Sequence, residues 1–62
     1  MKFVDFLAEL RVNKAKELLD DTQVSIQDIA LQVGYANAIT FGRVFKRVTG
    51  MTPGDYRKLN HP

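Results

Sequence analysis

Residues 38–47 carry basic and hydroxyl side chains at intervals that suit one side of a helix. At 100° per residue, the side opposite the apolar stripe of this segment carries Ile39, Gly42, Arg43 and Lys46. Thr40 and Arg47 lie on one flank. An arginine donates two parallel hydrogen bonds to a pair of acceptors, and a lysine supplies a point charge. Ile39 points away from the core, so it is either a contact for an apolar group of a partner or an isolated surface isoleucine.

The charges of the chain are unevenly distributed, which favours a polyanionic partner. Residues 1–31 hold four Lys and Arg against six Asp and Glu, a net charge of −2. Residues 32–62 hold five against one, a net charge of +4. Such asymmetry favours a polyanionic partner for the C-terminal half. The alternatives are a solvated basic face without a partner and, for Lys46 and Arg47, a structural role at the negative end of the helix dipole.

Other chemistries find little support in the sequence. There is no cysteine, and His61 is the only histidine, so neither a metal site nor a disulfide is expected. The carboxylates are scattered, no serine or threonine has a histidine nearby, and no glycine-rich phosphate loop follows a strand. We therefore expect no enzyme and no cofactor. No segment approaches the roughly 20 apolar residues that cross a bilayer, and no signal peptide is recognisable, so we expect a cytoplasmic chain without a membrane partner.

Helices must position the basic face, and the apolar periodicity predicts about four of them in one small all-α bundle. The expected ranges are 4–21 for a first helix, 25–50 for two helices joined by a tight turn, and 52–59 for a closing helix. A short helix, a glycine turn and a longer helix form the helix-turn-helix pattern. The longer helix, about residues 38–49, carries the basic face.

Residues of the expected types mark the ends of these helices. The second, third and fourth helices begin at residues that cap a helix N-terminus, namely Ser25, Asn37 and Thr52. Gly34 and Gly50 follow the second and third helices, where the backbone often becomes left-handed. Asp20 and Asp21 are unfavourable at the negative end of the first helix dipole, so we expect that end to fray.

Apolar stripes predict the core. The third helix contributes Phe41, Val44, Phe45 and Val48. The first helix contributes Val4, Ala8, Val12, Ala15 and Leu19, with Leu18 beside them. A second stripe on the first helix, Phe3, Phe6 and Leu10, has nothing left in this chain to cover it. Arg11 is expected to be partly buried and to bond a helix-end carbonyl or a carboxylate rather than contact DNA. Gly42 costs about 1 kcal/mol of helix propensity relative to alanine, which is understandable if another backbone approaches it closely.

A series of small, apolar and basic residues follows a fixed order over about residues 6–58. Its members are Arg11, Ala15, Leu18, Leu19, Ser25, Ile26, Ile29, Ala30, Val33, Gly34, Tyr35, Phe41, Arg43, Phe45, Lys46, Gly50, Thr52, Pro53, Tyr56 and Arg57. This order resembles the C-terminal signature of the AraC/XylS family of transcription activators. Agreement at so many positions, almost without gaps, is very specific.

The resemblance implies a DNA-binding domain in which a long central helix joins two helix-turn-helix units. This chain resembles the central helix and the second unit, so residues 1–62 are expected to be one partial domain of this type. The Phe3, Phe6 and Leu10 stripe would face the missing first unit. An effector-binding or dimerisation domain is a further expected part, and the location would be the bacterial nucleoid.

The family also implies which residues contact DNA. Carried over by position, the base contacts are Ala38, Ile39, Thr40 and Arg43. The expected phosphate contacts are Asn37, Lys46 and Arg47. Ala38 and Ile39 stand where polar residues are common in the family, so the contact at Ile39 is expected to be apolar, for example with a thymine methyl group.

Two functions from different classes remain open at this point. The first is sequence-specific binding of double-stranded DNA in bacterial transcription regulation. The second is a helical protein-interaction module that uses the Ile39 face or the Phe3 face against RNA polymerase, a partner subunit or a second copy of the chain. The two are compatible, and the salt dependence of binding distinguishes them.

Overall fold

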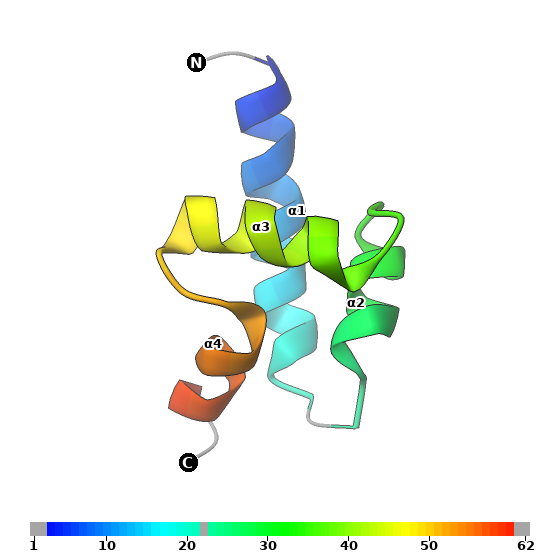
Figure 1. Cartoon of the computed structure of the whole chain (residues 1–62), viewed down its shortest axis with the longest axis vertical. Helices are drawn as coiled ribbons and strands as arrows, with labels where there is room; N and C mark the ends of the chain where they lie inside the picture. The colour runs from blue at the N-terminus through cyan, green and yellow to red at the C-terminus, as the bar shows by residue number, and fades with distance from the viewer. Residues whose placement is uncertain (1–2, 22, 61–62) are drawn as a thin grey trace.

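Four helices make up most of the chain, in the order expected from the sequence (Figure 1). The computed structural model describes residues 3–21 and 23–60. Within these ranges the elements are α1 (Phe3–Leu19), α2 (Ile26–Gln32), α3 (Ala38–Thr49) and α4 (Pro53–Asn60), and no strand is found. The prediction of a small all-α bundle that contains a helix-turn-helix is therefore confirmed. The first helix ends at Leu19, two residues before the predicted end, which agrees with the unfavourable acids that follow.

α1 is the support on which the other helices pack (Figure 1). α3 crosses α1 near its middle, while α2 and α4 lie on either side of its C-terminal half. The first turns of α1 project beyond α3 at the end of the molecule marked N. This arrangement leaves α3 with one side packed on α1, α2 and α4 and the other side exposed.

The predicted caps form. The three capping oxygens of Ser25, Asn37 and Thr52 accept the backbone N–H groups of Asp28, Thr40 and Asp55 at 3.1, 2.9 and 3.1 Å. Gly34 and Gly50 have φ angles of +103° and +86°, the left-handed region that a side chain disfavours. After Gly34, the backbone N–H of Tyr35 donates to the carbonyl of Ala30 at 2.9 Å, which closes the C-terminal end of α2.

The core joins α1, α2 and α3, and the parts from α1 and α3 follow the predicted apolar stripes with one correction. The fully buried side chains are Val12, Ala15, Leu19, Ile29, Ala30, Phe41 and Phe45. Val44 is half-buried, but Val48 is 38% exposed, so its assignment to the core was wrong. Val48 lies in the last turn of α3, beside the part of α1 that projects beyond the bundle, and no helix of the described chain covers it. The side chain of Val4 lies outside the described residues.

An aromatic row links the helix-turn-helix to α4. Neighbouring rings in the order Tyr35, Phe41, Phe45 and Tyr56 have centroids 5.9, 5.6 and 5.6 Å apart. Tilted and edge-to-face pairs at such spacings add attraction beyond the burial of apolar area. Within α3 the row fixes the inner side from Phe41 to Phe45, so the orientation of its outer side is also determined.

None of the helices within the described ranges is both long and apolar enough to cross a membrane. In the same part of the chain, no group of three or more metal-binding side chains comes together. His61, considered above as a metal ligand, lies outside the described residues.

Candidate nucleic-acid interface

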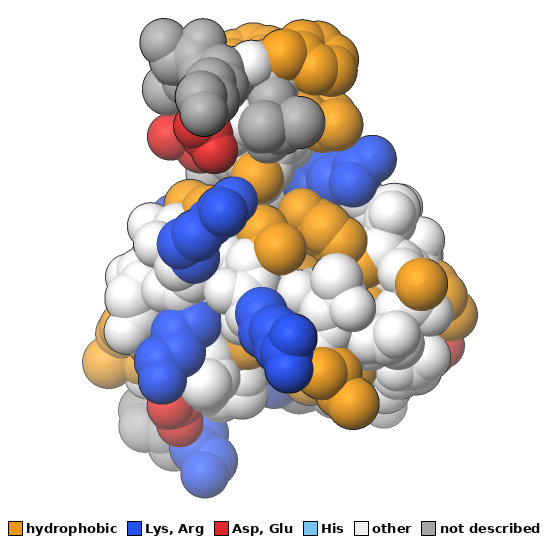
Figure 2. Space-filling model, turned by 45° about the horizontal axis from the view of Figure 1, so that its top comes forward, with side chains coloured by type: hydrophobic (Ala, Val, Ile, Leu, Met, Phe, Trp, Pro, Cys, Tyr) orange, Lys and Arg blue, Asp and Glu red, His pale blue; other side chains and the backbone are white. Residues whose placement is uncertain are grey.

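The predicted base-contacting residues form the outer side of the first turns of α3. Ile39 is 72% exposed, and Thr40 and Arg43 are exposed with it, whereas Phe41 beneath them is fully buried. Ala38 is half-buried at the start of the helix. Figure 2 shows Lys and Arg side chains spread across this face of the molecule, with apolar side chains between them. The face therefore combines basic groups with an exposed apolar side chain, as the sequence predicted.

Asn37 was predicted both to cap α3 and to contact a phosphate, and the structure shows the cap. Its Oδ1 atom accepts the backbone N–H of Thr40, which caps α3. Asn37 is exposed, and the cap uses only its side-chain oxygen, so its side-chain nitrogen remains a potential donor. A phosphate contact from Asn37 is thus compatible with its cap, and the cap fixes which way its amide points.

Gln27 makes a contact that the sequence analysis missed. Its Oε1 atom accepts the backbone N–H of Ala38 at 3.0 Å, which ties the first turn of α2 to the first residue of α3. The two residues are eleven positions apart, and an exposed glutamine on a short helix gives no sign of such a partner. The start of α3 therefore has two side-chain acceptors, Gln27 from α2 and Asn37 from the turn.

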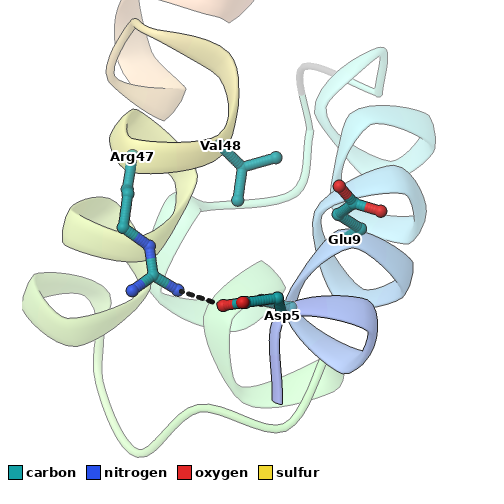
Figure 3. Close-up of a pocket in the computed structure, with 5 residues that line it drawn as sticks. Asp5, Glu9, Arg47 and Val48 are labelled. Carbon is teal, nitrogen blue, oxygen red and sulfur yellow. Dashed lines mark ion pairs between the residues drawn. The ribbon is translucent and has the colours of Figure 1, made fainter. Parts of the chain in front are cut away.

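The two predicted phosphate-contacting basic residues differ in their surroundings. Lys46 is exposed on α3. Arg47 is also exposed, but its Nη2 atom lies 4.0 Å from Oδ1 of Asp5 on α1 (Figure 3). The side chains of Arg47 and Asp5 border an open hollow of about 460 Å³ between α1 and the end of α3. Its other lining residues are Ala8, Glu9 and Val48. Arg47 is thus shared between the basic face and an acidic edge of α1.

Gly42 lies in the middle of α3 and is not required by the packing of this chain. A Cβ atom added there would meet nothing within 4 Å, and its φ angle is not in the left-handed region. Gly34 is the opposite case, because an added Cβ would lie 3.2 Å from the guanidinium of Arg11 in addition to straining the backbone. The glycine at position 42 therefore has no explanation within the described structure, which favours a partner that approaches it.

Arg11 is partly buried, as predicted, but against a different group. Its guanidinium carbon lies 5.1 Å from the centre of the Tyr35 ring, a cation–π contact, and among the described residues it is not found on a carbonyl or carboxylate. The ring and Gly34 together enclose the guanidinium at the turn between α2 and α3. Arg11 is therefore part of the support for the turn between α2 and α3.

The carbonyl-bonding arginine that we expected at position 11 is found at position 57. The Nε atom of Arg57 donates to the carbonyl of Leu19 at 3.1 Å, and its Nη2 atom donates to those of Asp21 and Val24 at 3.0 and 2.6 Å. The last carbonyls of a helix lack partners within it, and no glycine follows α1 to close its end. That missing C-terminal cap is the signal in the sequence from which a donor could have been inferred.

Comparison with known proteins identifies the class of this module. A family model described as a helix-turn-helix domain matches residues 1–59, which is nearly the whole chain. The bifunctional transcriptional activator/DNA repair enzyme AdaA of Bacillus subtilis is 42% identical over 57 residues, covering 92% of this chain and 27% of that protein. The raffinose operon transcriptional regulatory protein RafR of Pediococcus pentosaceus is 44% identical over 52 residues, covering 84% and 19%.

A third relative, the melibiose operon regulatory protein of Escherichia coli, is 40% identical over 55 residues, covering 89% of this chain and 18% of that protein. The chain thus spans about a quarter or less of the length of these relatives. No solved structure matches it. The chain belongs to the AraC/XylS family of helix-turn-helix transcription regulators.

Proposed function

We propose that α3 enters the major groove of double-stranded DNA, with Ala38, Ile39, Thr40 and Arg43 toward the base edges. Lys46, Arg47 and Asn37 would contact the phosphates on either side of the groove. The observation that carries this proposal is the division of α3, whose inner side is buried by the aromatic row while its outer side is basic and exposed. In helix-turn-helix proteins the N-terminal part of the second helix contacts base edges.

Binding by this chain alone should be weak. One helix in one groove makes few phosphate contacts, and affinities without sequence preference are typically about 10⁻⁴–10⁻⁶ M near physiological salt. The test is fluorescence anisotropy of the chain with a duplex selected from random DNA, at several salt concentrations. We expect a micromolar dissociation constant that weakens steeply as salt increases. A nanomolar constant for a single site, or binding that is independent of salt, would contradict this docking.

We further propose that the whole protein carries a first helix-turn-helix unit and an effector-binding or dimerisation part. The support is that the relatives are several times longer than the matched segment. In this arrangement the chain acts on nucleoid DNA in the bacterial cytoplasm and catalyses no reaction itself. The match to the bifunctional AdaA covers only 27% of that protein and brings no enzymatic activity to this chain.

A second candidate function, protein interaction, rests on the projecting end of α1. Phe3, Phe6 and Leu10 are 76, 50 and 50% exposed there. Exposed apolar clusters on a small domain mark association surfaces. We propose that, without a first unit to cover it, this stripe pairs two copies of the chain, and contacts with RNA polymerase belong to the same class of function. Sedimentation at high concentration should show dimers that Phe6→Asp removes, and a strict monomer at all concentrations would exclude the pairing.

A further inference from the structure

We infer that Gln27 is a positioning residue for the base contacts, and that it acts through the backbone of Ala38. The inference rests on the proposed docking of α3 and extends it to a residue outside that helix. The hydrogen bond from the Ala38 N–H to Oε1 of Gln27, at 3.0 Å, crosses the turn and joins the first turn of α2 directly to the first turn of α3.

The inner and outer sides of the turn are held by different groups. On the inner side, the rings of Tyr35 and Phe41 lie 5.9 Å apart within the aromatic row. This contact resists separation of the helices, but rings at such a spacing tolerate small rotations. On the outer side, a backbone N–H requires its acceptor within a narrow range of distance and direction. The Gln27 bond therefore limits the rotation of α3 about the inner contact.

The position of this bond matters because base contacts depend on small displacements. Ala38 is followed directly by Ile39 and Thr40, the side chains placed toward the bases. Arg43 is more than one turn further along the helix and has a long, flexible side chain. A rotation at the start of α3 would therefore move the Ile39 contact more than the Arg43 contact. Gln27 should affect the preference for some base pairs and leave others unchanged, whereas a loss of folding would weaken all of them.

Three variants separate positioning from stability. Gln27→Met keeps the length of the side chain but removes the acceptor, and Gln27→Glu keeps an acceptor oxygen. Gln32→Met is the matched control, because Gln32 is the exposed glutamine at the other end of the same helix. The first measurement is the exchange of the Ala38 amide hydrogen with solvent, by NMR of the free chain. Exchange should become about fivefold faster in Gln27→Met, the factor that one ordinary hydrogen bond contributes, and remain slow in Gln27→Glu and Gln32→Met.

The second measurement is the preference among duplexes that differ by one base pair, starting from the duplex selected by the unaltered chain. Gln27→Met should reduce the preference about fivefold at the base pairs that Ile39→Ala also affects, and leave the pair affected by Arg43→Ala unchanged. Equal weakening for all duplexes, or unchanged Ala38 exchange in Gln27→Met, would overturn the inference. If the unaltered chain shows no base preference, the proposed docking fails, and the exchange of Ala38 alone decides whether Gln27 positions α3.

Discussion

The guanidinium of Arg47 on α3 lies 4.0 Å from the carboxylate of Asp5 on α1. Both side chains are more than half exposed, so the ion pair contributes at most about 1 kcal/mol and is screened by salt. Arg47 is also one of the residues that we place at a DNA phosphate. A phosphate and Asp5 would therefore compete for the same guanidinium.

Asp5→Asn should accordingly raise the affinity for DNA. We expect an increase of about two- to fivefold at low salt that diminishes at high salt, because the competing carboxylate is removed. Glu9→Gln is the control, since it removes the same charge from the same hollow without breaking the ion pair between Arg47 and Asp5. Fluorescence-anisotropy titrations measure the DNA affinity of both variants. An equal effect of the two would mean that net charge, rather than the Arg47–Asp5 ion pair, sets the affinity.

Arg43 and Lys46 should differ in what their loss changes. Arg43→Ala is expected to cost about 1–3 kcal/mol on the preferred duplex and to relax the preference at one base pair. Lys46→Ala should weaken all duplexes alike and reduce the slope of log K against log salt by about one, because a phosphate contact carries no sequence information. Selection of random DNA against each variant measures this. A change of preferred sequence in Lys46→Ala, with uniform weakening in Arg43→Ala, would show that α3 is docked incorrectly.

Ile39 should contact the methyl group of a thymine in the DNA. With 72% of its surface exposed, it contributes little to folding, so Ile39→Ala is expected to leave the melting temperature nearly unchanged. It should weaken binding only where the unaltered chain contacts a thymine methyl group. Replacing each thymine of the duplex with uracil in turn provides the measurement. The unaltered chain should lose affinity at one position, and the variant should lose none there.

Gly42 offers a test in which stability and binding change in opposite directions. Because an added Cβ meets nothing in the chain, Gly42→Ala should stabilise the fold by about 0.5–1 kcal/mol through helix propensity. The same methyl group, on the outer side of α3, should weaken DNA binding if the DNA backbone approaches position 42 closely. Thermal unfolding and anisotropy of one sample give both values. A variant that is more stable and binds equally well would show that position 42 does not meet the DNA closely.

The helices were predictable from the sequence because their ends carry strong local signals. Ser25, Asn37 and Thr52 cap the helices expected of them, and Gly34 and Gly50 are left-handed. The error at Val48 arose because periodicity assigns a residue to a side of its helix but cannot tell whether a neighbour reaches that far. The projecting end of α1 and the open hollow leave Val48 partly uncovered.

The contacts of Gln27, Arg11 and Arg57 could not be predicted in the same way. Each joins residues that are far apart in the sequence, such as Arg57 and Leu19, 38 positions apart. Long polar side chains reach several possible partners, and only the packed arrangement of the helices selects one. The sequence therefore predicted the exposed outer side of α3 well, because it depends on one helix alone, and missed the contacts that these long side chains make between helices.

Arg57 is the residue whose loss should destabilise the fold most among the basic side chains. Three of its N–H groups donate to the carbonyls of Leu19, Asp21 and Val24, which connects α4 to the end of α1 and to the segment that leads into α2. Its positive charge also lies at the negative end of the α1 dipole. Hydrogen bonds to charged groups contribute about 1.5–3 kcal/mol, and water can partly replace Arg57 at the exposed Asp21.

Arg57→Met should therefore lower the free energy of unfolding by about 2 kcal/mol, which for a domain of this size corresponds to a decrease of roughly 8–16 °C in the melting temperature. Arg57→Lys should recover only part of this loss, because one ammonium group cannot match the positions of three carbonyls. Lys58→Met removes the same charge from the next residue of α4, which is exposed and makes no ion pair within the described part of the chain, and should change the melting temperature little. The measurement is thermal unfolding followed by circular dichroism, with DNA binding compared at a temperature where all variants are folded. Under those conditions Arg57→Met should keep its base preference, because Arg57 lies on α4 and supports the fold from the side of α1. An equal decrease for Arg57→Met and Lys58→Met would mean that charge alone, and not the three hydrogen bonds, stabilises the end of α1.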